Sequence, residues 1–377
     1  MHAVGFCANV LPGRNLQELR DALLGDGARI ARLVGDGAVP IGMWLSAETV
    51  RQLHEAPDEV ARLRDDLMQA GLQVAAVNAF PYGNFLGDRV KEQVYQPHWA
   101  DARRLLYTLA VAELLPDLVT PGTRHASVST VPLGWRTRFS AEGCGASVGL
   151  AAAQLEQAAN AMARIEDRTG LRVTLDLEPE PGCAIQTFDE LCGFMQHCLR
   201  GWEACRRHLG ACVDLCHAAI MGEPPGHAMA TCTAAGVGVH RVQVSAALRG
   251  TGTQRAALAR WAEDRWLHQV VTGTMHEPRV WADIPDFVAS GDRADWRCHF
   301  HVPVFLDRVG DLETTAGSLP QAMERIRGLA EPCFVEVETY AWSRLPEVAA
   351  PSLIEGVARE VLHARALLAR TGVSADA

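Results

Sequence analysis

The sequence lacks an apolar run long enough to cross a membrane. No segment approaches the ~20 consecutive apolar residues of a spanning helix. The first residues, MHAVGFCANVLPGRN, contain no basic leader followed by the apolar stretch of a signal peptide. We therefore expect no membrane span and a cytoplasmic location.

Basic residues are scarce relative to acidic ones. The 377 residues include 35 Lys and Arg against 45 Asp and Glu, which gives a formal charge of −10. Such a field repels phosphate backbones, and no Lys/Arg-rich run with interleaved aromatic residues offsets it. We expect no nucleic-acid partner.

Cysteine pairs with the spacing of a metal or redox motif are also absent. The chain has 11 cysteines, but none form a C-x-x-C pair. This number is small for a disulfide scaffold of such length, and free cysteine is among the residue types most often buried. Reduced, buried thiols are therefore the better interpretation.

The composition and pattern that remain are those of a large α/β protein. Hydrophobic residues make up 48% of the chain and charged residues 21%, which is ordinary for a globular domain with a sizeable core. Short apolar runs alternate with longer stretches of helical periodicity, as in βαβ units. Eight candidate strands can be placed, and they span 2–8, 39–45, 72–79, 117–121, 171–178, 210–215, 239–245 and 333–339.

Helix signals between these strands agree with this division. Ser46 is placed as an N-cap, and Thr187 with Glu190 has the spacing of a capping box. Residues 97–115 have the apolar periodicity of a helix that packs on the outside of the sheet. Pro116 is expected to end that helix.

Eight strands with intervening helices predict a (β/α)₈ TIM barrel, formed as a single domain over residues 1–377. Two intervals between strands are longer than a βα unit needs. They predict insertions after strands four and seven, at about 122–145 and 250–330. Both leave the C-terminal end of a strand, where barrel enzymes carry their active sites, so we expect them to cover the catalytic face.

Four predicted strands end in a polar residue of the metal-ligating type. One solvated carboxylate at a strand end is ordinary, but three that converge on one rim repel one another unless a cation compensates. Oxygen ligands suit Mn²⁺ or Mg²⁺, while Zn²⁺ or Co²⁺ becomes competitive if His217 or His301 also reaches the ion. The predicted ligands are Glu178, Asp214, Gln243 and Glu338.

Two further carboxylates compete for these roles. Glu336 has the same parity as Glu338, so both should face the barrel interior. Glu180 follows a proline and is either a loop residue or a ligand. Asn78, at the end of the third strand, is a candidate pocket residue beside them.

The second predicted insertion contains a strand-like run, CHFHVPVF at 298–305. His299 and His301 share one face of this run because side chains alternate along a strand. Two interpretations remain open, namely two histidines satisfied in a core or two that descend onto the metal site.

The strand-end motifs resemble those of xylose isomerase-like TIM barrels, the sugar phosphate isomerase/epimerase superfamily, and most of all hydroxypyruvate isomerase. In that family a Glu-Pro motif, an Asp-x-x-His motif, a Gln and a final Glu hold the metal. Many related epimerases have His in place of the Gln, so the Gln narrows the branch. The matching positions are Glu178-Pro179, Asp214 to His217, Gln243 and Glu338.

Longer motifs are similar to the metabolite traffic protein EboE family, a sugar isomerase-like barrel encoded in a cluster for secondary-metabolite export. They are NAFPYGNF, VKEQVYQPHW, STVPLGW, CHFHVPVF and VETYAW. The resemblance implies a sugar-like or polyol-like small-molecule ligand. A homodimer and proteins of the same export cluster are further candidate partners.

The isomerase resemblance implies proton abstraction beside a metal-bound carbonyl, with Glu178, Glu338 and His217 as catalytic residues. Residues implied in substrate binding are Arg249, His299, His301 and Asn78. One alternative is a metabolite-binding or trafficking protein that performs no reaction. Another is a metal-dependent hydrolase like endonuclease IV, which predicts more histidine ligands and a basic face.

Overall fold

The computed structural model describes residues 2–11, 13–35, 37–83, 89–140, 144–199, 203–345 and 352–369. The last two residues of the NAFPYGNF motif lie outside this description. Among the described residues, no helix is both long enough and apolar enough to cross a membrane.

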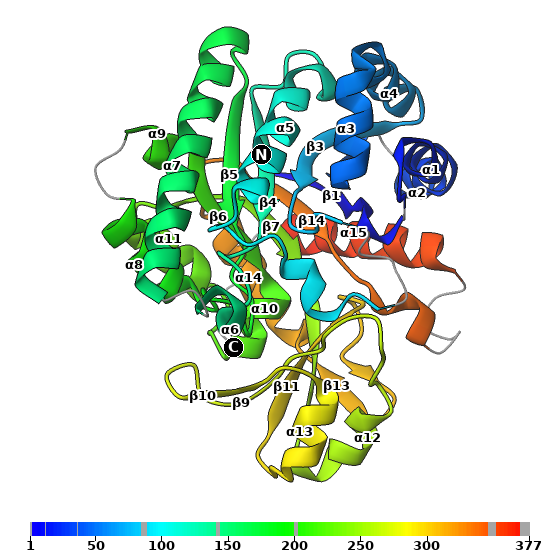
Figure 1. Ribbon diagram of the computed structural model, residues 1–377. Coiled ribbons are helices and arrows are strands. Elements are labelled where there is room, and N and C mark those ends of the chain that lie inside the picture. The colour runs from blue at the N-terminus through cyan, green and yellow to red at the C-terminus, as the bar shows by residue number, and fades with distance from the viewer. Residues whose placement is uncertain are drawn as a thin grey trace.

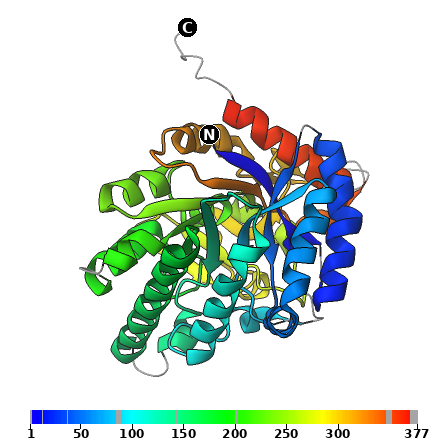
Figure 2. The same ribbon diagram turned by 90° about the horizontal axis from the view of Figure 1, so that it is seen from above.

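Eight parallel strands close into a barrel, as predicted (Figures 1 and 2). Closure is made by the first and last barrel strands, with Ala3 paired to Phe334. The strands are almost wholly buried because side chains fill the interior and helices cover the outside. In spatial order they are β1 (Ala3–Cys7), β14 (Phe334–Val337), β7 (Gly238–Val244), β6 (Leu209–Asp214), β5 (Arg172–Leu177), β4 (His125–Thr130), β3 (Leu72–Asn78) and β2 (Val39–Trp44).

Helices surround the barrel in a ring (Figure 2). The predicted starts at Ser46 and Thr187 are confirmed, since each side chain accepts a hydrogen bond from a backbone N–H three residues later. The helices are α1 (Leu16–Ala22), α2 (Ala28–Val34), α3 (Ala47–Glu55), α4 (Pro57–Gln69), α5 (Ala102–Leu118), α6 (Arg136–Ser140), α7 (Cys144–Thr169), α8 (Phe188–Cys198), α9 (Glu203–His208), α10 (Leu215–Met221), α11 (His227–Ala235), α14 (Leu319–Arg327) and α15 (Leu353–Ala369).

The helix before the fourth strand does not end at Pro116. It is α5, which continues to Leu118 with Pro116 inside it. A proline in a helix interior removes one backbone hydrogen bond. Here Leu115 and Leu118 are fully buried, so the packing of this last turn outweighs that loss.

The predicted fourth strand at 117–121 is therefore wrong. The strand is β4, whose residues HASVST fall inside the segment 122–145 that was assigned to the first insertion. Because its polar side chains face a polar barrel interior, the strand lacks the apolar pattern by which the other strands are predicted. Ser127, for example, donates a hydrogen bond of 2.6 Å to Asp176.

Between β7 and β14 the chain forms a second, six-stranded antiparallel sheet at one end of the barrel (Figure 1). The run that contains His299 and His301 is a strand, as predicted, and it belongs to this sheet and not to the barrel. We call residues 246–315 the roof. Its elements are β8 (Ala246–Gly250), α12 (Arg255–Ala259), β9 (Val270–Gly273), β10 (Pro278–Trp281), α13 (Ile284–Ser290), β11 (Trp296–Val302), β12 (Arg308–Val309) and β13 (Leu312–Thr314).

Candidate metal centre and its pocket

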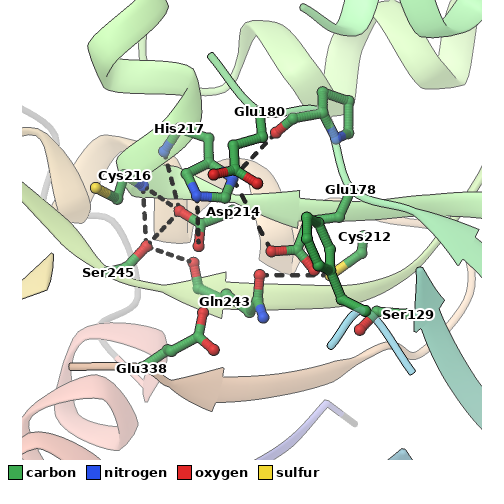
Figure 3. A network of polar contacts seen from close by, with 12 residues as sticks. Ser129, Glu178, Glu180, Cys212, Asp214, Cys216, His217, Gln243, Ser245 and Glu338 are labelled. Atoms are coloured by element: carbon green, nitrogen blue, oxygen red, sulfur yellow. Dashed lines mark hydrogen bonds and ion pairs between the residues drawn. The ribbon is translucent and has the colours of Figure 1, made fainter. Parts of the chain in front are cut away.

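Three carboxylates meet at the C-terminal ends of β5, β6 and β14 (Figure 3). Glu178, Asp214 and Glu338 each present an oxygen, and these oxygens all lie within 4.8 Å of one another. All three side chains are buried. Burial raises the pKa of Glu178 well above its usual range, and the charges of Glu338 and Asp214 raise it further.

Only one carboxylate oxygen of Asp214, Oδ1, accepts hydrogen bonds from the described residues. Its Oδ1 accepts hydrogen bonds from the backbone N–H of Cys216 at 2.6 Å and of His217 at 3.0 Å, and from the Ser245 hydroxyl at 2.7 Å. This makes Asp214 the N-cap of α10. Its Oδ2 has no hydrogen-bond partner among the described residues, and the same is true of Glu178 Oε2.

Buried polar atoms in proteins normally have partners. Two unpartnered carboxylate oxygens in a cluster of three carboxylates are therefore the donor set that a divalent cation such as Mg²⁺ or Mn²⁺ requires. The residues present fit such an ion. Gln243 lies beside them, fully buried, with Oε1 3.6 Å from the Cys212 thiol (Figure 3).

Glu336 faces the interior, as its parity predicts, but it does not belong to the carboxylate cluster. Its Oε1 accepts a hydrogen bond of 2.6 Å from Arg241, and both side chains are fully buried. Arg241 also donates to the Ser129 hydroxyl at 3.0 Å. Burial raises the pKa of Glu336 to about 7 although Arg241 opposes the shift. This ion pair forms the floor beneath the carboxylates.

Three imidazoles lie beside the carboxylates, one from α10 and two from β11. The Nε2 atom of His299 is 3.1 Å from that of His217 and 3.0 Å from that of His301. Burial lowers the pKa of His217 to about 4, and burial with the neighbouring imidazoles lowers the pKa of His299 well below 6.5. Both rings are therefore neutral at pH 7.

The carboxylates Glu178 and Glu338 and all three imidazoles line one cavity of about 120 Å³ between the barrel and the roof. Glu180, which the sequence allows as either a loop residue or a metal ligand, also lines this cavity. The Tyr95 hydroxyl donates a hydrogen bond of 2.6 Å to Glu180, and the Gln269 amide lies 3.2 Å away. Burial raises the pKa of Glu180 to about 8, so this carboxyl is largely protonated near neutral pH.

Not every predicted substrate residue reaches this cavity. Asn78 lines it, and its side-chain oxygen accepts a hydrogen bond of 2.9 Å from Phe80 N. Arg249 does not, because β8 leaves the barrel and carries its side chain to the surface. There it is 55% exposed and pairs with Glu313 at 2.9 Å. The structure thus places Arg249, predicted to bind substrate, outside this cavity.

Several pocket residues escaped the sequence-based reasoning. Tyr340 donates a hydrogen bond of 2.7 Å to Glu338, and Lys91, the only lysine in the chain, closes one side of the pocket. Tyr340 lies in the motif VETYAW and Lys91 in VKEQVYQPHW. These two motifs could therefore have pointed to both residues. Arg241 shares the parity of Gln243, and the period of two predicts that both face the interior.

The chain is thus an eight-stranded parallel barrel with buried acidic residues at the C-terminal ends of its strands. These two features are the basis for comparing it with known proteins. No protein-family model matches the chain, and no curated protein matches it significantly. Solved structures of xylose isomerase-like TIM barrel and sugar phosphate isomerase/epimerase proteins do match in fold.

One is a xylose isomerase-like TIM barrel protein from Mycobacterium smegmatis in complex with magnesium, with 14% identity, 98% and 97% of the two chains covered, and a TM-score of 0.55. A second is a D-psicose 3-epimerase in the presence of D-fructose, with 12% identity, 97% and 99% covered, and a TM-score of 0.52. A third is a putative sugar phosphate isomerase/epimerase from Anabaena variabilis, with 15% identity, 98% of both chains covered, and a TM-score of 0.51. At these identities the likeness establishes the shared barrel fold.

Proposed function

We propose that this protein is a metal-dependent sugar isomerase or epimerase that moves a proton beside the carbonyl of its substrate. One observation carries the proposal. Glu178, Asp214 and Glu338 converge at one end of the barrel, and two of them present buried oxygens without a hydrogen-bond partner among the described residues. A divalent cation held there, with Gln243 as a fourth ligand, would stabilise the negative charge that develops when a C–H next to a carbonyl is deprotonated.

Side chains of the site are placed to transfer the proton. Glu178 directly follows β5 and Glu338 directly follows β14, and each is a candidate to accept or return the proton. Glu338 is oriented by hydrogen bonds from Tyr340 at 2.7 Å and from the Cys7 thiol at 3.2 Å. His217 is held through its Nδ1, 3.0 Å from the Pro179 carbonyl oxygen, which fixes the orientation of its ring beside the carboxylates.

The position of the roof over the site favours a small molecule as the substrate. It covers the cluster with Trp266, His268 and Phe300, which line the cavity together with His299 and His301. A substrate that displaces water from this cavity would have its carbanionic centre protected and its electrostatic interactions with the site strengthened. A nucleic-acid substrate would have to reach the ligands past this cover and against the acidic charge of the chain.

For the substrate class, we propose a sugar-like or polyol-like intermediate of secondary metabolism, as the resemblance to the EboE family implies. Four of the five motifs that carry this resemblance border the pocket. Asn78, Tyr95, His301 and Tyr340 each come from a different one of them, and all four line the cavity. Metabolite carriage without reaction is the competing hypothesis, because the same pocket could hold a ligand unchanged.

Incubation with a panel of aldoses and ketoses in D₂O with Mn²⁺ or Mg²⁺ tests the proposal. We expect deuterium at the carbon next to the carbonyl, detected by NMR, and a loss of at least about 10²-fold in the rate for Glu178→Gln and Glu338→Gln. Glu313→Gln, a matched change at an exposed glutamate of the roof, should leave the rate unchanged.

Metal analysis of the same proteins gives an independent measurement. Asp214→Ala and Glu338→Ala should lose the ion, while Glu313→Gln keeps it. A ligand that binds without exchange would favour the carrier hypothesis. Exchange that survives in both glutamine variants would disprove the assigned roles.

A further inference from the structure

We propose that His217, His299 and His301 form a second metal site, distinct from the carboxylate centre, which binds a transition ion of the zinc or cobalt class. This site does not depend on the proposed reaction. It follows from how the three rings face one another.

The ring nitrogens of the three histidines converge. The Nε2 atoms of His217 and His301 lie 3.1 and 3.0 Å from Nε2 of His299. Nitrogens at about 2.0–2.1 Å from one tetrahedral Zn²⁺ are separated by about 3.4 Å, so each of these two separations is close to that of two ligands on one ion. Ligand atoms of Asp214, His217 and His301 also lie within 4.8 Å of one another.

The outer nitrogens of these rings face hydrogen-bond acceptors. His217 Nδ1 lies 3.0 Å from the Pro179 carbonyl oxygen, and His301 Nδ1 lies 3.0 Å from the Glu338 carbonyl oxygen. A carbonyl oxygen only accepts, so both Nδ1 atoms carry the hydrogen, and in the neutral ring Nε2 presents a lone pair. The outer contacts thus fix which nitrogen points inward.

The third ring follows the same rule. His299 Nδ1 lies 2.6 Å from Gln269 Oε1. The orientation of that amide is set at its other end, where Nε2 donates to the Tyr95 hydroxyl at 2.7 Å and to Glu180 at 3.2 Å. The outer contacts of the three rings thus leave their Nε2 atoms facing one another, in the position of metal ligands. Metal-bound histidines characteristically donate their other N–H to such carbonyl oxygens.

One oxygen of Asp214 also points toward the histidines and has no hydrogen-bond partner among the described residues. Its Oδ2, fully buried, lies 3.9 Å from Nε2 of His217 and 3.8 Å from Nε2 of His301. Asp214 belongs both to this group and to the carboxylate group. It is therefore placed to bridge two ions, as carboxylates do in binuclear centres.

The donor types separate the two sites chemically. The carboxylate centre offers oxygen atoms, which suit Mg²⁺ or Mn²⁺. The histidine site offers imidazole nitrogens, and the thiol of Cys216 lies within 4.8 Å of a nitrogen of both His299 and His301. Nitrogen and sulfur donors favour Zn²⁺ or Co²⁺. Two of the three rings come from β11, so the site requires the roof.

Metal counting on the full-length protein tests this inference. After chelation and reloading with Mn²⁺ and Zn²⁺, we expect two ions per chain in the wild type, one of them zinc. The double variant His299→Ala/His301→Ala should lose the zinc and keep the manganese, whereas Glu178→Gln should weaken manganese binding and keep the zinc. His276→Ala, which removes an exposed imidazole of the same roof, is the matched control and should keep both.

A measurement on the wild type avoids any folding defect of the variants. Titration of the chelated protein with Co²⁺ should give a visible absorption band of a nitrogen-ligated ion, and zinc X-ray absorption should show about three imidazoles at about 2.0–2.1 Å. One ion per chain that is lost equally from the histidine and glutamate variants, or zinc bound only by oxygen, would overturn the inference. Failure of the isomerase assay would not affect this count.

Discussion

The buried ion pair beneath the carboxylates gives a prediction about stability. In Arg241→Met the shape of the long side chain is largely kept, but Glu336 loses its partner, and both residues are fully inaccessible to solvent. Removing one member of a buried pair typically costs about 3–5 kcal/mol. With an unfolding entropy of about 2.1 cal/mol/K per residue, this cost should lower the Tm by about 4–6 °C for a chain of 377 residues.

The pH dependence of this loss distinguishes an ion pair from simple packing. Burial raises the pKa of Glu336 to about 7, so the carboxylate that needs Arg241 is present mainly above that pH. The difference in Tm between wild type and Arg241→Met should therefore widen as the pH rises through 7, measured by calorimetry or circular dichroism. Arg241→Met/Glu336→Gln should recover much of the stability. A loss that is independent of pH and equal in the single and double variants would refute the reasoning.

Three other changes have defined outcomes. Burial raises the pKa of Glu223 from 4.5 to about 8, so the folded state holds a proton that the unfolded chain releases, and stability falls as the pH rises between these values; Glu223→Gln should flatten that slope in urea melts. Gly42→Ala should destabilise by about 1–3 kcal/mol or more, because its Cβ would lie 2.0 Å from a buried carboxylate oxygen, while Gly25→Ala, with open space around it, should not destabilise. Lys91→Met should loosen the roof, since Lys91 binds Asp283 at 2.6 Å, and hydrogen exchange near Asp283 should then accelerate; unchanged exchange would contradict this role.

The barrel could be predicted from sequence wherever its strands are apolar. The segment VPIGMW reads as a buried strand, and it is one. The fourth strand failed because the barrel interior is unusually polar, so the pattern of HASVST carries no apolar signal. Its serines are satisfied by Asp176 on β5 and Arg241 on β7, partners that are distant in sequence.

The candidate site shows the same division between local and long-range information. The convergence of Glu178, Asp214 and Glu338 follows from strand ends, a local feature that parallel strands bring to one rim. The position of Arg249 cannot be inferred from a strand end, because β8 leaves the barrel and joins the roof. The approach of His299 to His217 likewise depends on how the second sheet packs on the first, which no periodicity encodes.

The central claim, a metal-dependent proton transfer in this pocket, is tested most directly by solvent exchange with and without metal. The chelated protein, a sugar that it binds and D₂O should give no deuterium at the carbon next to the carbonyl, and addition of Mn²⁺ or Mg²⁺ should restore incorporation. Incorporation at the same rate in the chelated protein, with metal content verified at zero, would contradict the account.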